Sequence, residues 1–196
     1  MTIVSIVNEV CDLAALSRFD KFYGNNDDTC ALLMTLLTEG GNEISLRAEW
    51  PSLIRQVPVT SDTFIVPPDF RRVYGKGAVM MADGSFARPV MAATSWEIIR
   101  KSSSSLWYFL DGKTLRLSSF SSPVTFFYIS YHWILGSDGK NKAMISLDDD
   151  VPVFPEHLLV KNVLWRWRRS QGLVFQDELQ EFEGSLALET SLFEDS

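Results

Sequence analysis

The sequence has few of the residues from which small catalytic centres and structural metal sites are built. Its 196 residues include two cysteines, Cys11 and Cys30, and two histidines, His132 and His157. Two cysteines in this spacing form no disulfide framework, no CxxC motif and no zinc site. There is no GxSxG motif, and Gly75-Lys76-Gly77 lacks the residues that complete a phosphate-binding loop. We therefore expect no catalytic residue, no metal and no cofactor.

Long apolar runs and an excess of positive charge are also absent. No segment approaches the roughly 20 apolar residues that cross a bilayer, so we expect no membrane partner. The start of the chain, residues 1–4, has neither the basic residues nor the cleavage site of a signal peptide, which predicts synthesis in the cytoplasm. The 18 Lys and Arg residues are outnumbered by 25 Asp and Glu residues, and the net charge of -7 disfavours a dedicated nucleic-acid clamp.

The composition is that of a folded protein. Hydrophobic residues make up 46% of the chain, aromatic residues make up 12%, and the mean hydropathy is +0.02. These values are sufficient for a real core and argue against disorder. The length allows one domain or two small ones.

Charge is unevenly distributed along the chain. The last twenty residues contain seven acids and no Lys or Arg, and the remaining 18 acids equal the 18 bases elsewhere. A basic cluster, Lys161, Arg166, Arg168 and Arg169, lies just upstream. Two interpretations stay open: a solvated helix face followed by a frayed acidic tail, or an element that docks on a basic partner surface.

Helical periodicity marks both ends of the chain. Thr2 caps a first predicted helix, and Asp28 caps a second, which continues through Gly40-Gly41 at a cost of about 1 kcal/mol per glycine. Pro155 opens a C-terminal helix that ends near Ser170. After Gly172, a further helix is predicted from an apolar stripe of four residues, Phe175, Leu179, Phe182 and Leu186.

The middle of the chain has strand patterns. Asp111-Gly112, between two apolar runs, predicts a hairpin with a type I′ turn, in which both central residues have positive φ. Residues 124–135 predict one long strand that is aromatic on both faces, so that one face is covered by the chain's own helices and the other by a neighbouring subunit. Shorter strands are predicted over residues 60–66 and 143–147, and a short helix over 94–99.

This order of elements predicts an α+β protein. We expect a helical bundle built from the N- and C-terminal helices, with a β-rich insertion between them. The expected boundaries are 1–55 for the N-terminal helices, 56–150 for the insertion and 151–196 for the C-terminal helices and acidic tail, all within one compact domain. Trp50, Trp107, Trp133 and Trp167 are expected in the core.

The C-terminal helix carries two apolar faces. Four residues, Val160, Val163, Leu164 and Trp167, form one stripe. Leu158 and Trp165 lie nearly opposite it, beside Arg169. Either the following helix covers Trp165, or Trp165 and Arg169 contact another subunit, because Trp and Arg are favoured interface anchors.

The acidic triplet Asp148-Asp149-Asp150 is the one candidate for metal-assisted chemistry. It lacks the DxDxDG spacing of a calcium loop, and acidic triplets are common in loops, so metal binding is the weaker interpretation. His132 is expected in the core because it lies in an apolar strand. His157 is expected to be solvated at a helix start.

Several segments, taken in order, resemble one known family. They are Trp50-Pro51-Ser52-Leu53, Val66-Pro67-Pro68-Asp69-Phe70-Arg71-Arg72, Ser95-Trp96-Glu97, Trp107-Tyr108-Phe109, Phe127-Tyr128-Ile129-Ser130, Ser137-Asp138-Gly139-Lys140, Asp148-Asp149-Asp150, Pro155-Glu156-His157-Leu158-Leu159 and Trp165-Arg166-Trp167. In this arrangement the chain resembles the head-to-tail adaptor, or connector, proteins of tailed bacteriophages. The resemblance covers about residues 3–186.

The resemblance implies a structural virion protein rather than an enzyme. Such adaptors form a ring, usually dodecameric, beneath the portal in the neck of the particle, and extend the channel through which genomic DNA passes without specific binding. The expected partners are the portal protein, other neck or tail proteins and further copies of the chain. The alternatives are a stopper or tail-completion protein of the neck and, less favoured, a small metal-dependent hydrolase using the acidic triplet with His157.

Seven residues are the candidates for contacts with the portal or a neighbouring subunit: Trp165, Arg166, Arg168, Arg169, Phe182, Leu192 and Phe193. The free protein is expected to be monomeric or weakly associated and to form its ring on the portal. Leu192 and Phe193, flanked by acids, are expected to anchor a C-terminal segment whose order depends on the partner.

Overall fold

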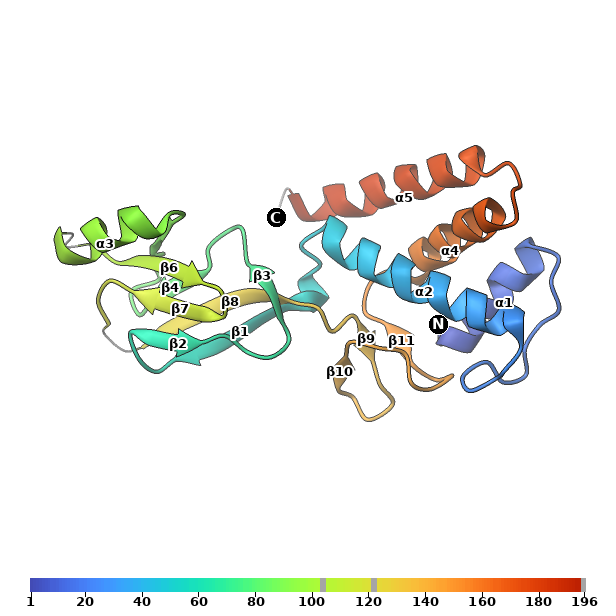
Figure 1. Cartoon of the computed structure of the whole chain (residues 1–196), viewed down its shortest axis with the longest axis horizontal. Coiled ribbons are helices and arrows are strands. Elements are labelled where there is room, and N and C mark those ends of the chain that lie inside the picture. Colours follow the sequence, from blue (N-terminus) through green and yellow to red (C-terminus); the bar gives the residue numbers. More distant parts are fainter. Residues whose placement is uncertain (103–104, 121–122, 195–196) are drawn as a thin grey trace. The chain divides into compact units, whose positions relative to one another are not determined.

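The computed structural model describes residues 1–102, 105–120 and 123–194, with the backbone alone for residues 102, 193 and 194. The chain forms two compact units. The helical unit contains Met1–Leu53 and Tyr131–Ser196, and the β-rich unit contains Ile54–Ser130. Helices lie at both ends of the sequence and strands in its middle, which confirms the α+β class (Figure 1). The expected boundary at residue 150 differs from this division, because residues 131–150 group with the helices.

The helical unit is organised around one helix. Helix α4 packs against α1, α2 and α5, and a small antiparallel sheet in the order β10-β9-β11 completes the unit. The elements are α1 (Ile3–Leu13), α2 (Asp28–Arg47), the 3₁₀ turn η1 (Pro51–Leu53), β9 (Ile134–Leu135), β10 (Asn141–Lys142), β11 (Val151–Pro152), α4 (Glu156–Ser170) and α5 (Gln176–Glu194).

The N-termini of the first two helices are capped by side chains. Thr2 accepts a hydrogen bond from the Ser5 N–H, as expected. Helix α2 is capped by Asp27 rather than by Asp28, since the Asp27 carboxylate accepts from the backbone N–H groups of Thr29 and Cys30 at 2.8 and 3.2 Å. These bonds satisfy N–H groups that have no partner within the helix.

Helix α2 runs unbroken through Gly40 and Gly41, as predicted, and the contacts of these glycines explain why they are tolerated. A Cβ atom at position 41 would lie 2.2 Å from Cη2 of Trp133, and one at position 40 would lie 2.5 Å from Oδ1 of Asn162. The glycines therefore allow the helix backbone to approach Trp133 and α4 closely, at the propensity cost noted above.

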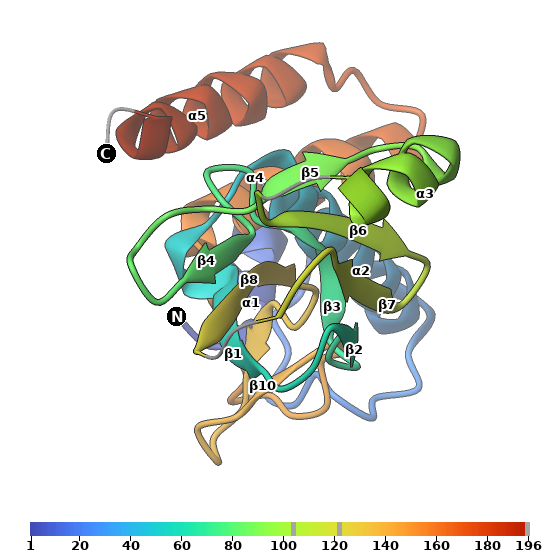
Figure 2. The same cartoon turned by 90° about the vertical axis from the view of Figure 1, so that its left-hand side faces the viewer.

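The β-rich unit consists of two sheets that share one core. In one sheet β8 pairs with β1, β3 and β4, and the other has the order β2-β7-β6-β5 (Figure 2). Phe126 and Tyr128 of the first sheet belong to the same buried cluster as Leu115 and Leu117 of the second. The strands are β1 (Ile54–Val59), β2 (Thr63–Ile65), β3 (Phe70–Val73), β4 (Val79–Met81), β5 (Arg88–Val90), β6 (Trp107–Asp111), β7 (Thr114–Leu117) and β8 (Val124–Ser130).

Helix α3 (Ala93–Ser102) joins two parallel strands. Strands β5 and β6 pair in parallel, and a parallel pair requires a crossover connection of this kind. Trp96 of α3 stacks on Phe109 of β6, with ring centroids 5.8 Å apart. The predicted short helix is thus confirmed and is longer than expected.

Three strand predictions differ from the structure. The hairpin over residues 107–117 is present, but its two-residue turn is Gly112-Lys113, and of these only Gly112 has positive φ, which fits type II′ rather than type I′. The long strand predicted to reach Leu135 ends at Ser130, where the chain passes from one unit to the other. Residues 143–147 form no strand, and the pairing segment is β10 instead.

The tryptophan predictions are correct in part. Trp50 and Trp133 are fully buried, as expected. Trp107 and Trp167 are half-buried, whereas Trp96 and Trp165, which were not assigned to the core, are buried. Helix α4 is buried on several sides because it has three helical neighbours, so a single stripe did not identify its core residues.

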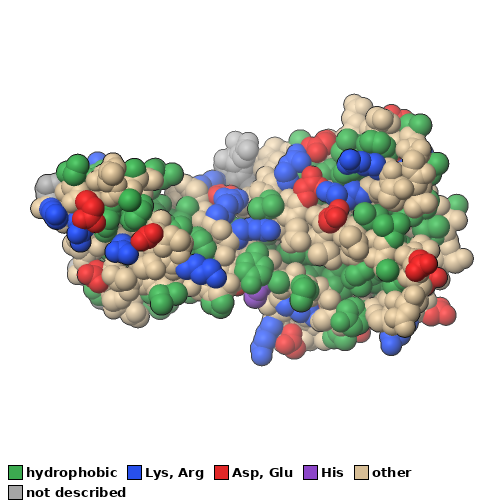
Figure 3. All heavy atoms as spheres, in the orientation of Figure 1, with side chains coloured by type: hydrophobic (Ala, Val, Ile, Leu, Met, Phe, Trp, Pro, Cys, Tyr) green, Lys and Arg blue, Asp and Glu red, His purple; other side chains and the backbone are tan. Residues whose placement is uncertain are grey.

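The two units carry charge of opposite sign. The β-rich unit has nine Lys and Arg residues against five Asp and Glu residues, and the helical unit has nine against twenty, which gives net charges of +4 and -11. Blue side chains are spread over the face of the β-rich unit that Figure 3 shows. No helix in the described part of the chain is both long and apolar enough to span a membrane.

Candidate interaction surface

The candidate contact residues lie on α4 and α5, and most of them interact within the chain. Trp165 is 7% exposed, and its ring lies 6.2 Å from that of Phe175, at the start of α5. The Arg166 guanidinium lies 4.7 Å from the centroid of the Trp165 ring. Of the two interpretations of Trp165, the structure favours cover by the chain itself.

The indole nitrogen of Trp165 is buried without a hydrogen-bond partner among the described residues. A cavity of about 250 Å³ lies beside the ring and is lined by five further residues: Leu36, Glu39, Arg166, Arg169 and Ser170. An unsatisfied buried donor costs about 1–3 kcal/mol, so the Trp165 nitrogen reduces the stability of this region.

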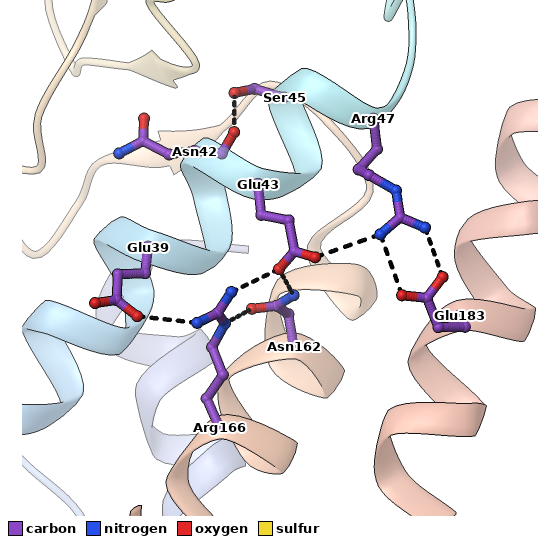
Figure 4. A network of polar contacts seen from close by, with 8 residues as sticks. All are labelled: Glu39, Asn42, Glu43, Ser45, Arg47, Asn162, Arg166 and Glu183. Carbon is purple, nitrogen blue, oxygen red and sulfur yellow. Dashed lines mark hydrogen bonds and ion pairs between the residues drawn. The ribbon is translucent and has the colours of Figure 1, made fainter. Parts of the chain in front are cut away.

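Arg166 is the centre of a polar network between α2 and α4 (Figure 4). Its guanidinium donates to Glu39 at 2.9 Å, to Glu43 at 2.7 Å and to the side-chain oxygen of Asn162 at 2.8 Å. The amide of Asn162, which is fully buried, donates to the same Glu43 carboxylate at 2.9 Å. Arg166 therefore fixes α2 against α4, and its donors are used inside the unit.

The network extends to α5 through one further ion pair. Arg47, in the last turn of α2, holds Glu183 with two hydrogen bonds of 3.1 and 2.6 Å and lies 3.4 Å from Glu43. Burial raises the pKa of Glu43, but hydrogen bonds from Arg166 and Asn162 lower it by more, so the pKa lies below its usual value. Glu43 is therefore ionised between two cations at neutral pH.

Helix α5 carries much of the acidic charge, and three of its acids contact bases of the helical unit. Glu183 pairs with Arg47, Glu178 lies 3.1 Å from Arg168, and Glu189 lies 3.4 Å from Nε2 of His157. Arg168 also donates to the carbonyl of Val174 at 2.8 Å, which holds the turn between α4 and α5. The basic partner surface that the acidic segment meets in this structure is thus the chain's own.

The expectation for the end of the chain requires correction. The C-terminal segment, expected to become ordered on its partner, is helical without one: α5 continues past Gly184 to Glu194, and Glu189 lies beside His157. Phe182 is fully buried and Leu186 is 3% exposed, so Phe182 belongs to the core and is not free to bind a partner. Arg169 is exposed, and Leu192 is 64% exposed. The side chain of Phe193 lies outside the described residues.

The acidic triplet organises loops. The Asp150 side chain is fully buried, accepts hydrogen bonds from the N–H groups of Ser146 and Leu147 at 2.7 and 3.0 Å, and pairs with Lys142 at 2.7 Å. Asp148 accepts from the N–H groups of Phe22 and Tyr23. These bonds use the carboxylate oxygens that a metal would need, and no metal-binding cluster of His, Cys, Asp or Glu occurs among the residues that the structure describes.

The triplet also anchors the first helix through its backbone. The carbonyls of Asp150 and Asp148 accept from the N–H groups of Ile3 and Val4 at 2.7 and 3.2 Å. These are N–H groups of the first turn of α1, which have no partner inside the helix. The loop therefore holds α1 in place, a role that the sequence did not indicate.

The remaining candidate groups are the two cysteines and the two histidines. Cys11 and Cys30 are buried free thiols, and burial raises the pKa of both, which favours the unreactive protonated form. His132 is half-buried against Tyr131, with ring centroids 4.7 Å apart, rather than in the core as expected. His157 is exposed, as predicted.

Comparison with known families finds no family model that matches the chain, and no curated protein matches it either. The class of the protein is accordingly given by its own structure: an α+β chain in which helices from both ends form one unit and a β-rich segment is inserted between them.

Proposed function

We propose that this chain is a head-to-tail adaptor of a tailed bacteriophage, a structural virion protein that forms a ring beneath the portal. In this proposal α1, α2, α4 and α5 form the helical bundle of the adaptor, and the β-rich unit is its insertion. The chain then acts by assembly rather than by chemistry, in the neck of the particle after synthesis in the host cytoplasm.

The observation that carries the proposal is the ordered set of motifs described above, and the structure supports it by giving those motifs architectural roles. In the motif over residues 66–72, Asp69 accepts a hydrogen bond from the Tyr128 hydroxyl at 2.9 Å, and Phe70 stacks on Phe126. Trp50 packs on Phe154, just before the motif at 155–159 that opens α4. Motif residues that hold the fold together are what a structural protein of the virion requires.

The hydrolase alternative has less support. It needs the acidic triplet and His157 to act together on a substrate. Asp148 and Asp150 instead accept backbone hydrogen bonds in a loop, and His157 lies beside Glu189 of α5. The stopper and tail-completion alternatives share the assembly role and are separated from the adaptor only by position in the neck.

The proposed portal contact involves the outward side of the end of α5. Leu192 is 64% exposed there, and it is flanked by acids that would steer it towards a basic partner surface. Truncation is a poor test of this contact, because residues 187–194 are part of α5. The single substitution Leu192→Ser leaves the helix and its buried residues in place.

The decisive experiment is genetic. In the phage that encodes this chain, deletion of the gene should leave filled heads and free tails that do not join, and a plasmid copy should restore particles. Cross-linking of purified particles should connect this protein directly to the portal, whereas a stopper would cross-link to an intermediate protein instead. Normal infectious particles without the gene would refute the proposal.

Duplex DNA should pass the ring without tight binding. The net charge of the chain is -7, so the chain as a whole repels the phosphates of a duplex. A fluorescence titration at physiological salt should show no submicromolar affinity. A submicromolar Kd with a steep salt dependence would contradict a channel through which DNA slides.

A further inference from the structure

The opposite charges of the two units make two copies of this chain complementary. The β-rich unit carries +4 and the helical unit carries -11. Surfaces of opposite sign steer association and fix which patch meets which. Charge complementarity therefore favours a contact between the basic unit of one copy and the acidic unit of the next.

The basic site is a pocket on the β-rich unit, at the end of α3. Its volume is about 290 Å³, and six of its lining residues are Asp62, Thr63, Trp96, Arg100, Lys101 and Arg116. Arg100 and Lys101 lie in the last turn of α3, and Arg116 lies on β7 opposite Thr63 and Phe109, on the sheet face away from the core. The stacking of Trp96 on Phe109 fixes α3 over this face, and with it the backbone positions of Arg100 and Lys101 relative to Arg116.

The cations of this pocket are available to an incoming carboxylate. Arg100 pairs with Glu97 and Arg116 pairs with Asp111, and all four side chains are more than 40% exposed. Exposed ion pairs contribute about 0–1 kcal/mol, so they exchange readily for another anion. Lys101 has no ion-pair partner among the described residues, and Asp62 is the single acid lining the pocket.

The acidic site is the outward side of the first half of α5. Glu178, Glu183 and Glu189 point to bases of their own unit, as described above, but Asp177 and Glu181 are exposed and have no ion-pair partner within the described chain. These two residues are four positions apart, so their carboxylates stand on one face of the helix, about 6 Å apart along its axis. They form a pair of acids with the spacing of one helical turn.

We propose that Asp177 and Glu181 of one copy bind in the pocket formed by Arg100, Lys101 and Arg116 of a second copy. The proposal deepens the adaptor function and rests on it for the ring. The two patches differ, so the contact is heterologous. In a pair of copies one keeps a free pocket and the other keeps a free helix patch, so repetition of the contact closes a ring or continues as a filament.

A protein carboxylate fits this pocket better than a DNA phosphate chain does. The pocket is small, with a volume that accommodates a few side chains, and the net charge of the whole molecule opposes approach of a duplex. The contact is electrostatic and partly exposed, so it is weak between free copies and strengthened when the portal holds them side by side.

The test is a charge exchange measured by sedimentation velocity at high protein concentration. Wild-type protein should associate at about 10 mM salt, where the Debye length is about 30 Å, and dissociate at about 1 M, where it is about 3 Å. The pocket variant, Arg100→Glu with Arg116→Glu, and the helix variant, Asp177→Arg with Glu181→Arg, should each weaken association at low salt by about tenfold or more. An equimolar mixture of the two variants should associate again, because each reversed patch then meets its opposite.

Matched controls separate this contact from general effects of charge. The variant Lys113→Glu with Lys140→Glu makes the same change in net charge at two exposed positions outside the pocket, and it should associate like the wild type. All variants should keep the wild-type melting temperature within a few degrees, because none of the substituted side chains is buried.

Three results would overturn the proposal. They are a wild-type protein that stays monomeric at low salt, a mixture of variants that fails to associate, and a pocket variant whose only loss is binding of duplex DNA. The last result would assign the pocket to phosphate. If the mixed variants associate but the protein is absent from the phage neck, only the adaptor function is refuted. If the protein is present in the neck but the mixed variants do not associate, only this contact is refuted.

Discussion

The indole ring of Trp133 occupies the space that a side chain at Gly41 would need. The Cη2 atom lies 2.2 Å from the position of a Cβ at residue 41, and the ring stacks on Phe154 with centroids 5.7 Å apart. Close packing of this kind tolerates little added volume, since interiors are packed like organic crystals. The pair Gly41 and Trp133 therefore joins α2 to the segment that follows the β-rich unit.

The substitution Gly41→Ala should destabilise the protein. Alanine favours helix by about 1 kcal/mol, but overpacking costs about 1–3 kcal/mol and more where the ring cannot move. The matched control is Gly184→Ala in α5, where a Cβ meets nothing within 4 Å, and it should stabilise by about 0.5–1 kcal/mol. Urea denaturation measures the change in unfolding free energy of both variants. A change of the same sign in the two variants would contradict the proposed packing.

Arg166 and Arg169, three residues apart on α4, should respond differently to alanine. Arg166→Ala removes the charged partner of the half-buried Glu43 and should cost about 1.5–3 kcal/mol of unfolding free energy. Arg169→Ala should change it by less than about 0.5 kcal/mol, because Arg169 is exposed and forms no ion pair with a described residue. Thermal unfolding measures the stability of both variants. A comparable loss of stability in the two would rule out the polar network as its cause.

The stability of the protein should fall in acid partly through Asp150. Burial raises the pKa of Asp150, but hydrogen bonds from Lys142, Ser146 and Leu147 lower it by more, so the folded-state pKa lies below the unfolded value of about 3.9. Stability from this group is therefore present above the unfolded pKa and is lost as the pH falls through the folded pKa. The pKa of Glu43 is also lowered in the folded state, so its contribution to stability is likewise lost in acid.

The variant Asp150→Asn should be less stable at pH 7 by about 1–3 kcal/mol, and its unfolding free energy should depend less on pH below about pH 4. Asp149→Asn, at an exposed neighbouring position, serves as the control and should retain the wild-type profile. Denaturation at a series of pH values gives both curves. An unchanged acid limb in Asp150→Asn would show that other groups control acid unfolding.

Replacement by phenylalanine should cost different amounts of stability at the two buried tryptophans, Trp133 and Trp165. Trp133 donates its indole N–H to Asn42 at 3.2 Å, whereas that of Trp165 has no partner in the part of the chain that the structure describes. An unsatisfied buried donor destabilises the folded state by about 1–3 kcal/mol, and Trp165→Phe removes that donor. The loss of unfolding free energy in Trp165→Phe should therefore be at least about 1 kcal/mol smaller than in Trp133→Phe. Both proteins can be compared by chemical denaturation; a larger loss in Trp165→Phe would mean that its N–H is satisfied.

Local patterns predicted the helices well because a helix repeats its contacts over several turns. The periodicity predicts that α2 continues through Gly40 and Gly41, although the helix ends at Arg47, and it predicts both ends of α4 to within a residue. The end of β8 at Ser130 was missed, because residues 131–135 continue the apolar pattern while belonging to the other unit. Sequence periodicity contains no signal for which unit an apolar strand joins.

The candidate site shows the same limit. Arg166 and Phe182 were selected because Arg and aromatic residues anchor interfaces, and the structure places both inside the helical unit. Their partners, Glu43 and the neighbouring helices, are distant in sequence, so no local spacing could reveal them. The charge segregation was visible in the sequence, but its division between the two units required the tertiary structure.

The order of the units along the chain has a consequence for synthesis on the ribosome. The β-rich unit is one continuous stretch, residues 54–130, and all its strand pairs are available once that stretch has emerged. Helices α1 and α2 are made before this stretch, yet the helix on which they pack, α4, begins at Glu156. Domains generally fold as units during translation at about 5–20 residues per second. Helices α1 and α2 therefore wait several seconds with their apolar faces uncovered, while the segment made after them can already fold. Nascent chains should accordingly be most open to chaperones at these two helices.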